Sequence, residues 1–552
     1  MSKIFANVVN DNFLLMLNSV EEDWPLLIGE KIYRSFSNMV PNKHMDAEIK
    51  INILLNLFHP EEILKDDKKR RILFERITEE KAKELSKLLK IKNCNTSSLY
   101  SELFKTKFSG QNKKIIMDYF GIEPIEEIES DSAIIPEDDG KVSYGLHFYQ
   151  AEVEKKAKHI LYSDEKAGNR CLIHMPTGAG KTRTAMDLLC NIMNEQSSAM
   201  ILWLAYNVEL CEQASKEFKS MWFHKGNREV KIINLFGDSK AELPCEKIDG
   251  IIFSTLGKID KVNKRDKVFF SQLSDKISVL VFDEAHQIIA PEYNNLVNQI
   301  IINNENCRLI GLSATPGRTW NNIEEDRKLS KFFNENISSI NTHADETPTQ
   351  MLKRMGYLSK IEWLPINFES DIFREKDYEL LKKISRIDGD FSLELAEKLS
   401  LDSKRNIRIV DSVRELTNNG KKRILIFATS VDHAKILSAL LNYAGFISDY
   451  IDYGTDHKRR KKIIEDFKNE SDEPRVLCNY NVLSTGFDAP KIDAGIIARP
   501  TVSVILFSQM VGRMIRGPKS GGTDTATIIT VVDVSLPGFK DSYNNWSDVW
   551  NE

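Results

Sequence analysis

The stretch Met175-Pro176-Thr177-Gly178-Ala179-Gly180-Lys181-Thr182 decides the fold of this chain. It follows an apolar run at residues 171–174 and precedes a segment with helical spacing at 183–189. A strand, a glycine-rich turn and a helix start form a P-loop, whose backbone N–H groups converge on a phosphate. Lys181 can then reach the β- and γ-phosphates of a nucleotide, and Thr182 can bind Mg²⁺. Met175 replaces the first glycine of the G-x-x-x-x-G-K-[ST] pattern.

A pair of carboxylates follows the next informative strand. The apolar run 279–282 ends in Asp283-Glu284-Ala285-His286. Ligand chemistry in α/β sheets lies at the carboxyl ends of strands. We expect Asp283 to hold Mg²⁺, mainly through water, and Glu284 to orient and deprotonate an attacking water. Alone, this strand end also fits an exposed turn, but its place after a P-loop favours the catalytic interpretation.

Beyond residue 143, short β-branched runs alternate with helical segments, which is typical of parallel α/β sheets. No repeat of fixed period is visible, so any duplication is of architecture only. We expect an α/β fold with two tandem parallel-sheet domains, at residues 144–345 and 346–540, and a tail at 541–552. The predicted strands are 171–175, 199–206, 230–235, 250–255, 278–283 and 307–313 in the first series, and 360–368, 422–428, 447–452, 475–479, 494–498 and 526–533 in the second.

The region before these strands differs in character. Residues 1–122 have helical spacing of apolar residues and predict an α-helical accessory domain without assignable chemistry. Residues 123–143 are rich in Pro, Ser and carboxylates and predict an acidic linker. A mixed-charge run at 65–71 and a basic run at 457–462 fit either solvated helix faces or phosphate contacts.

These motifs resemble those of the superfamily 2 helicases and ATPases with a D-E-A-H motif, in the DNA-repair and restriction-motor branch. The resemblance implies that both sheet domains are RecA-like. The stretch Leu146-His147-Phe148-Tyr149-Gln150 is similar to an L-R-x-Y-Q element, which implies that Gln150 reads adenine, although His147 replaces the Arg. The stretch Leu312-Ser313-Ala314-Thr315-Pro316 is similar to the S-A-T motif. This implies that Ser313, Ala314 and Thr315, with His286, couple hydrolysis to movement.

The second half carries two more motifs of this family. The stretch 484–490 (S-T-G-F-D-A-P) resembles the fifth motif, which implies that Gly486 and Asp488 lie at the nucleotide. The stretch 509–516 (Q-M-V-G-R-M-I-R) resembles the sixth, which implies catalytic roles for Gln509, Arg513 and Arg516. An arginine aimed at the γ-phosphate stabilises charge that develops in the transition state. Because the two arginines are three residues apart, we expect both on one helical face, pointing into one cleft.

The resemblance also implies cofactors and a nucleic-acid partner. The implied cofactors are ATP and Mg²⁺. Small hydroxyl and amide groups at strand ends suit phosphate contacts without base reading, although ordinary loop residues are the alternative. The expected nucleotide-binding residues are Gln150, Thr177, Gly178, Ala179, Gly180, Lys181, Thr182, Gly486 and Asp488. The expected nucleic-acid contacts are Tyr206, Asn207, Ser254, Thr255, Thr429, Ser430, Ser484 and Thr485.

Composition limits the class of protein. The 552 residues are 41% hydrophobic and 28% charged, with a formal net charge of −5, which excludes a generally basic coat. Nucleic acid would therefore be held by local patches and backbone amides. The seven cysteines form no C-x-x-C pair, which favours a reducing compartment. Without a long apolar run, we expect a cytoplasmic protein with no membrane span.

We therefore expect an ATP-driven DNA helicase or translocase. DNA is favoured because the sixth motif begins with Gln509, where the D-E-A-D RNA helicases of this superfamily usually have His. The layout with an N-terminal helical domain resembles helicases carried with bacterial antiphage systems. Two alternatives stay open. One is an RNA helicase, and the other is a nucleic-acid-gated ATPase switch that recruits an effector such as a nuclease without unwinding.

Overall fold

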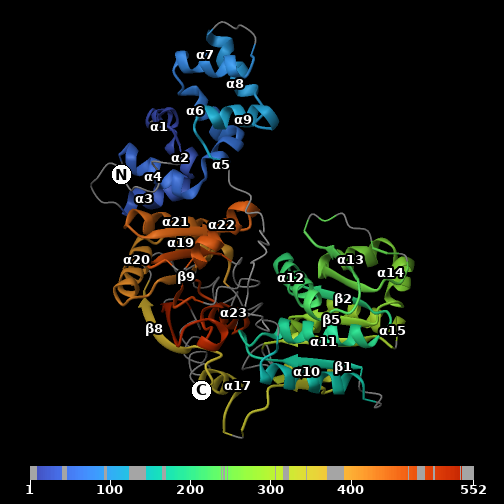
Figure 1. The fold of residues 1–552 in the computed structure, drawn as a ribbon. Helices are drawn as coiled ribbons and strands as arrows, with labels where there is room; N and C mark the ends of the chain where they lie inside the picture. The colour runs from blue at the N-terminus through green and yellow to red at the C-terminus, as the bar shows by residue number, and fades with distance from the viewer. Residues whose placement is uncertain are drawn as a thin grey trace, which may run out of the picture.

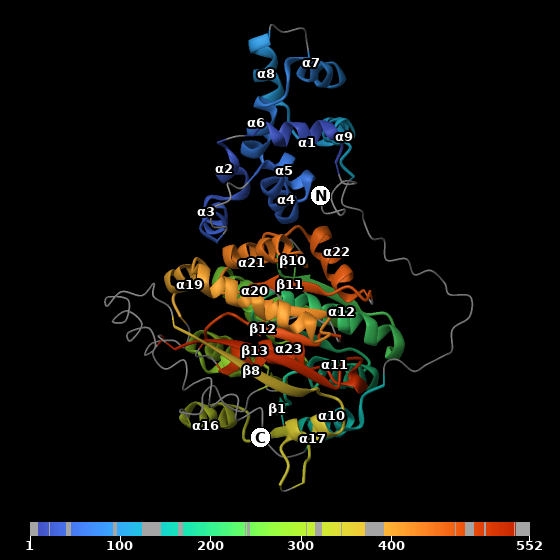
Figure 2. The same cartoon turned by 90° about the vertical axis from the view of Figure 1, so that its left-hand side faces the viewer.

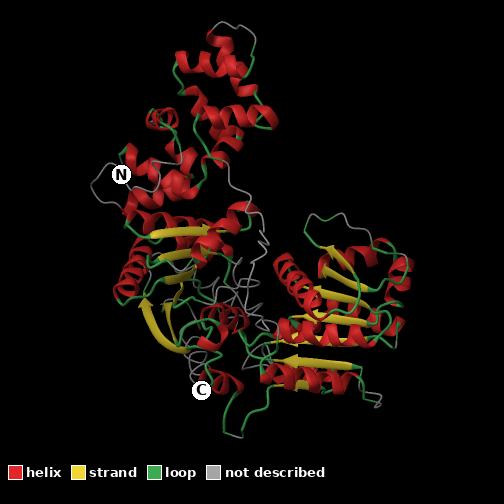
Figure 3. Cartoon of the chain, in the orientation of Figure 1, coloured by secondary structure: helices red, strands yellow, loops and turns green. Residues whose placement is uncertain are grey.

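The computed structural model describes residues 9–123, 145–369 and 391–536, with gaps at 21, 40–45, 92–95, 164–168, 238, 240–242, 245, 305, 315–322, 344, 470, 481–490, 502–503 and 535. The described residues form an N-terminal group of helices and two parallel sheets with helices around them (Figure 1). Figure 3 shows the same layout by secondary structure. We call the part built on β1–β7 the first lobe and the part built on β8–β13 the second lobe.

The first lobe is a parallel sheet with the strand order β3-β4-β2-β5-β6-β1-β7. Its central strands are buried along their length, as expected for a sheet covered on both faces. Strands β5, β6 and β1 are neighbours, so their carboxyl ends meet at one edge. The strands are β1 Arg170–His174, β2 Met200–Ala205, β3 Lys231–Leu235, β4 Gly250–Thr255, β5 Val279–Asp283, β6 Arg308–Ser313 and β7 Ile337–Ser339. The helices are α10 Phe148–Leu161, α11 Lys181–Glu195, α12 Val208–Lys225, α13 Leu256–Arg265, α14 Lys267–Ser274, η1 Ala285–Ile289, α15 Pro291–Asn303 and α16 Ile323–Phe332.

The second lobe repeats this architecture. Its sheet has the strand order β10-β11-β9-β12-β13-β8, and every pair is parallel. The strands are β8 Lys360–Phe368, β9 Arg423–Phe427, β10 Ile447–Ile451, β11 Arg475–Asn479, β12 Ala494–Ile497 and β13 Thr525–Asp533. The helices are α19 Leu393–Ser400, α20 Ser403–Asn418, α21 Val431–Tyr443, α22 His457–Lys468, α23 Val504–Met514 and η2 Pro518–Ser520; α17 Pro348–Arg354 lies between the sheets in the sequence.

All the strands predicted from the sequence are present, with ends that differ by at most one residue. Strand β7 was not predicted. It has only three residues and pairs with one neighbour, β1, at the edge of the sheet. So short a segment carries too little periodicity to be recognised. The prediction of two parallel sheets is confirmed.

The N-terminal region is helical, as predicted, and it docks on the second lobe. In both views its helices lie beyond α21 and α22 (Figures 1 and 2). One hydrophobic core runs through this region and one face of the second sheet. The Phe36 ring, for example, meets Tyr443 edge-on at 6.1 Å. The helices are α1 Asp11–Asn18, α2 Trp24–Ile28, α3 Glu30–Met39, α4 Ala47–Leu57, α5 Pro60–Lys65, α6 Asp67–Glu75, α7 Glu79–Leu88, α8 Thr96–Lys105 and α9 Gly110–Tyr119.

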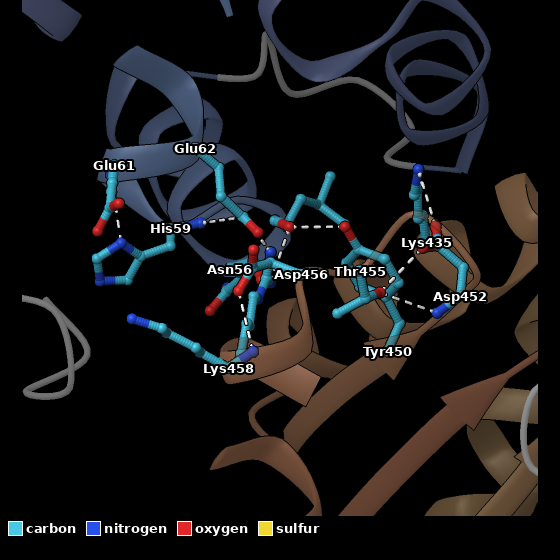
Figure 4. Close-up of polar contacts among 12 residues, drawn as sticks. Asn56, His59, Glu61, Glu62, Lys435, Tyr450, Asp452, Thr455, Asp456 and Lys458 are labelled. Atoms are coloured by element: carbon cyan, nitrogen blue, oxygen red, sulfur yellow. Dashed lines mark hydrogen bonds and ion pairs between the residues drawn. The ribbon is translucent and has the colours of Figure 1, made fainter. Parts of the chain in front are cut away.

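Polar contacts complete this docking interface (Figure 4). The Tyr450 hydroxyl donates to the Leu57 carbonyl at 2.9 Å, at the end of α4. The Arg459 guanidinium donates to the same carbonyl at 2.9 Å and pairs with Glu62. Arg459 belongs to the basic run 457–462, for which we considered a solvated face or phosphate contacts. Within this run, at least the Arg459 side chain makes its polar contacts inside the chain.

Candidate active site

The predicted P-loop joins the end of β1 to the start of α11. Gly178 and Gly180 have φ values of +84° and +83°, in the left-handed region that favours glycine. A Cβ on Gly180 would also overlap the side-chain amide of Gln150. The side chain of Met175, which stands where the pattern has a glycine, is buried in the core. Its N–H donates to the Ser313 carbonyl at 3.2 Å, so this position serves the sheet rather than the phosphate turn.

Two side chains of α10 support the P-loop through hydrogen bonds. The Gln150 amide donates to the Ala179 carbonyl at 2.9 Å, and the Tyr149 hydroxyl donates to the same carbonyl at 3.2 Å. Gln150 also accepts from the His147 N–H at 3.0 Å, as part of a capping box that starts α10. Gln150 is buried. In this conformation it supports the loop, and its contact with adenine stays a prediction.

The carboxylate pair lies at the carboxyl end of β5, near the P-loop. Asp283 is the last residue of the strand, and its carboxylate accepts from the Glu284 N–H at 3.0 Å. Glu284 has a φ of +57°, which is uncommon for a residue with a side chain and is often found at functional sites. Its carboxylate lies 3.3 Å from Nδ1 of His286. The backbone turn thus directs two neighbouring carboxylates to the same edge of the sheet.

The charges at this edge act on one another. Burial lowers the pKa of Lys181, against the opposing charges of Glu284 and Asp283. Lys181 as a whole residue is half-buried. Burial and then the charge of Glu284 raise the pKa of Asp283. Arg513, from the second lobe, acts on both Lys181 and Asp283. The side chains predicted from distant motifs therefore share one electrostatic site.

The second lobe meets the P-loop through α23. The Gln509 amide donates to the Glu284 carboxylate at 3.4 Å. A Cβ on Gly512 would overlap the Thr177 side chain, and one on Gly178 would lie 3.3 Å from the Gly512 carbonyl oxygen. The glycine of the sixth motif therefore permits close approach of α23 to the loop. This contact brings the sixth motif to the P-loop.

The arrangement of the two arginines differs from our expectation. Helix α23 ends at Met514, so Arg513 is helical but Arg516 is not. Arg516 instead forms an isolated antiparallel bridge with Leu358. The prediction that both share one helical face is wrong, because the helix ends before the second arginine. Both nevertheless lie near the first lobe, since Arg516 acts electrostatically on Tyr149.

The predicted coupling residues are placed in part. Ser313 is the buried last residue of β6 and Ala314 follows it. His286 is buried in η1 beside Glu284. Thr315 lies outside the described residues, as do Ser484, Thr485, Gly486 and Asp488 of the fifth motif. Thr182 is the second residue of α11 and is partly accessible, next to Lys181.

The predicted nucleic-acid contacts divide into accessible and buried residues. Tyr206 is 57% exposed after β2, and Thr255 and Ser430 are partly exposed at helix starts. The hydroxyl of Ser254 is buried and donates to the Leu235 carbonyl at 3.2 Å. The hydroxyl of Thr429 is buried and donates to the Ala396 carbonyl at 3.0 Å. The expectation is therefore corrected for these two side chains, which the core encloses.

Asn207 has a structural role that its motif did not reveal. Its side chain accepts from the Leu210 N–H at 2.9 Å and caps the start of α12. Ser430 does the same for α21, accepting from the His433 N–H at 3.1 Å. The first turn of a helix has several N–H groups without partners inside the helix, and the cap residue uses only some of them. The remaining N–H groups can bind an anion, so a capping role is compatible with phosphate contact.

Sequence reasoning missed the roles of two residues at this site and one contact between the lobes. Tyr149 lies in the motif at 146–150, but the support that its hydroxyl gives the P-loop was not predicted. Tyr357 packs against Tyr149 with ring centroids 5.0 Å apart, and no motif contained it. The contact of Gly512 with Thr177 joins residues far apart in sequence. Tyr149 carried a usable signal in its place directly before Gln150, and Gly512 carried one as the glycine of the sixth motif.

Comparison with known proteins agrees with the fold. The family described as "Type III restriction enzyme, res subunit" matches residues 143–318, and the "Helicase conserved C-terminal domain" family matches residues 407–518. These matches cover most of the first lobe and much of the second. The fold and the site thus define a two-lobed protein of the RecA-like helicase class. Within this class, the chain belongs to the superfamily 2 helicases.

Individual relatives share part of their length with this chain. It is 25% identical to the "Putative ATP-dependent helicase IRC3" of Saccharomyces cerevisiae over 354 residues, which cover 62% of this chain and 46% of that protein. It is 22% identical to the "Type I restriction enzyme EcoKI endonuclease subunit" of Escherichia coli, over 73% of this chain and 35% of that protein. The chain thus spans less than half the length of these two relatives.

A solved structure supports the fold. The structure of Mss116p bound to ssRNA and AMP-PNP superposes with a TM-score of 0.50 and 15% identity, and the match covers 74% of this chain and 73% of that one. At this identity the likeness concerns the fold alone.

Among the described residues, no helix has the length and apolar character needed to cross a membrane.

Proposed function

We propose that this chain is an ATP-dependent DNA helicase or translocase that hydrolyses ATP between its two lobes. The observation that carries this proposal is the contact of Gln509 with Glu284 at 3.4 Å. It brings the sixth-motif helix of the second lobe to the carboxylate pair of the first. Arg513 lies in the same electrostatic site as Lys181. ATP bound at the P-loop would then touch both lobes.

The residues present fit a complex of ATP and Mg²⁺. Lys181 and the N–H groups at the start of α11 would bind the phosphates. Thr182 and Asp283 would hold Mg²⁺, which supplies neutralisation of the charge on the β- and γ-phosphates. The donor set fits a divalent cation, because the Thr182 hydroxyl and the Asp283 carboxylate are oxygen ligands and the neighbouring Glu284 adds negative charge in a buried setting.

The proposed catalytic roles follow from the positions of the side chains. Glu284 would orient and deprotonate the attacking water, and Gln509 would hold the Glu284 carboxylate. Arg513 would stabilise the charge on the γ-phosphate in the transition state, a contribution worth roughly 10³–10⁵ in rate in related enzymes. Arg516 would also contact the phosphates, from the segment that follows α23. His286, Ser313, Ala314 and Thr315 would couple hydrolysis to movement.

Movement would come from opening and closing of the contact between the lobes. Tyr206 and Thr255 of the first lobe and Ser430 of the second are accessible and could grip one strand in turn. We include Asn207 and the fifth-motif residues Ser484 and Thr485 in this proposed track. Contacts to the backbone predict weak sequence preference and a steep dependence on salt.

Support for DNA comes from the sixth motif and from the restriction-enzyme relatives. The motif begins with Gln509 rather than His, which resembles the DNA-repair and restriction-motor branch. The family match and the EcoKI subunit support a motor within an antiphage or restriction-type system. We propose that it acts in the cytoplasm. In such a system, an effector such as a nuclease would belong to another chain.

One panel of assays tests this proposal. ATP turnover is measured with single-stranded DNA, duplex DNA, forked DNA and RNA, with Glu284→Gln as the control for contaminating ATPases. We expect DNA to stimulate wild-type turnover and the variant to bind ATP without hydrolysing it. Stimulation by RNA alone would replace this proposal with an RNA helicase. Stimulation by DNA without strand displacement or removal of a bound roadblock would instead indicate a switch.

A further inference from the structure

The segment that enters the second sheet, residues 355–359, packs against the element that supports the P-loop. We call this segment the connector. The ring of Tyr357 lies 4.6 Å from the ring of His147, 5.0 Å from that of Tyr149 and 6.2 Å from that of Phe148, measured between centroids. Tyr357 is largely buried by these contacts. Its ring therefore makes much of the contact between the connector and the start of α10.

The connector is also hydrogen-bonded to the segment that follows α23. The Gly517 N–H donates to the Tyr357 carbonyl at 3.1 Å, and the Ser359 N–H donates to the Ile515 carbonyl at 2.9 Å. The Ser359 hydroxyl donates to the Arg516 carbonyl at 2.7 Å. A Cβ on Gly517 would overlap the Gly356 carbonyl, so this close pairing requires glycine. The backbone at residues 515–517 is thereby fixed to the connector.

The same aromatic contact leads to the nucleotide loop. Tyr149 receives the Tyr357 ring on one side, and its hydroxyl donates to the Ala179 carbonyl at 3.2 Å. Leu358 reaches the loop as well, since a Cβ on Gly178 would lie 3.1 Å from its side chain. A continuous set of contacts therefore runs from Gly517, next to Arg516, through Tyr357 and Tyr149 to Ala179.

We propose that Tyr357 is a positioning residue that fixes the P-loop and the segment containing Arg516 in position relative to each other. When the second lobe moves, the connector moves with the Arg516 backbone, and the Tyr357 ring transmits this movement to Tyr149 and the loop. The inference rests on the proposed function for its effect on ATP, but the positioning of the loop is a separate structural statement. The ring carries the role, because these contacts are made by its faces and edge.

Hydrogen exchange tests the positioning without any reference to activity. The 552-residue chain is compared with Tyr357→Ala and Tyr357→Phe, each checked for folding by circular dichroism. Loss of the ring contacts should speed exchange of the amides at residues 178–182 by about fivefold to tenfold. Tyr357→Phe, which keeps the ring, should exchange as the wild type does. Equal exchange in all three proteins, or equal acceleration in both variants, would overturn the proposal.

A milder variant covers the case in which Tyr357→Ala fails to fold. Tyr149→Phe keeps the edge-to-face contact with the Tyr357 ring and removes only the hydroxyl that donates to Ala179. We expect it to speed exchange in the same peptide by a smaller factor, about twofold to fivefold. Unchanged exchange in this variant would contradict the part of the path that reaches the loop.

Kinetics then separate this inference from the proposed function. If the wild type hydrolyses ATP, Tyr357→Ala should raise the KM for ATP about tenfold and lower kcat, with both values restored in Tyr357→Phe. Wild-type values in Tyr357→Ala would overturn the positioning role. If the wild type hydrolyses no ATP with any nucleic acid, the proposed function fails, while hydrogen exchange still decides whether Tyr357 positions the loop.

Discussion

The Gln509 amide of the second lobe lies 3.4 Å from the Glu284 carboxylate of the first. These residues come from motifs in different lobes, and their contact defines where the lobes meet. Thr177 and Gly512 pack against each other beside them. The structure therefore shows the lobes in contact around the P-loop. Changes that keep them apart should affect ATP turnover more than folding.

Gly512→Ala should separate α23 from the P-loop. A Cβ at this position would overlap Thr177, whereas alanine is a better helix former than glycine by about 1 kcal/mol. We expect a folded protein whose ATP turnover falls by roughly a hundredfold, because small displacements of catalytic groups have effects of this size. ATP turnover and the unfolding temperature are the measurements.

The matched control for this change is Gly257→Ala. Gly257 lies in α13, where a Cβ would meet no heavy atom within 4 Å. This variant should keep wild-type turnover and gain a little stability. If the two variants have the same turnover, then Gly512 is not needed for close approach.

Arg459→Met should release the N-terminal helices from the second lobe. The change removes the ion-pair partner of the Glu62 carboxylate and one hydrogen-bond donor to the Leu57 carbonyl. We expect this to lower the free energy of unfolding by on the order of 3 kcal/mol. We expect faster hydrogen exchange in α4 and α5. Arg414→Met is the control, since its ion pair with Asp411 is about half exposed and worth little. Equal exchange in the two variants would contradict a docking role for Arg459.

The same interface should weaken in acid through His59. Burial, and then the charge of Arg459, lower the pKa of His59 to about 4. The unfolded state, with an ordinary pKa near 6.5, takes up a proton first, so stability falls as pH drops from about 6.5 towards 4. The neutral ring is needed because Nδ1 accepts from the Glu61 N–H at 3.2 Å.

A His59→Asn variant isolates this effect, because Asn can cap the helix start but does not titrate in this range. Unfolding temperatures of both proteins are compared from pH 7 down to pH 5. The wild type should lose stability relative to the variant across this window. A difference that stays constant with pH would show that His59 does not titrate in this way.

The strands and the phosphate loop could be predicted because each depends on a short stretch of sequence. The buried strands β5 and β9 have apolar sequences of strand length, and the turn around Gly178 and Gly180 has a composition specific to phosphate loops. Motif order then predicted that Lys181, Glu284 and Arg513 belong to one site. Each of these inferences needed only residues close together in sequence, or a family resemblance that spans the two lobes.

Other features depend on tertiary contacts that no local pattern records. The end of α23 before Arg516 is set by the pairing of Arg516 with Leu358, a residue far away in the sequence. Burial of the Ser254 and Thr429 side chains follows from the elements that cover them. Arg459 belongs to a basic run that fitted either a solvated face or phosphate contacts, and only the docking of α4 and α5 shows its partners.

The measurement that tests the central claim most directly is ATP turnover by Arg513→Ala under saturating nucleic acid, together with its affinity for ATP. Arg513 comes from the second lobe, while the P-loop belongs to the first. If the site is shared, turnover should fall by roughly 10³-fold or more, while ATP affinity stays within a few-fold of the wild type. Turnover at the wild-type rate would contradict hydrolysis between the lobes.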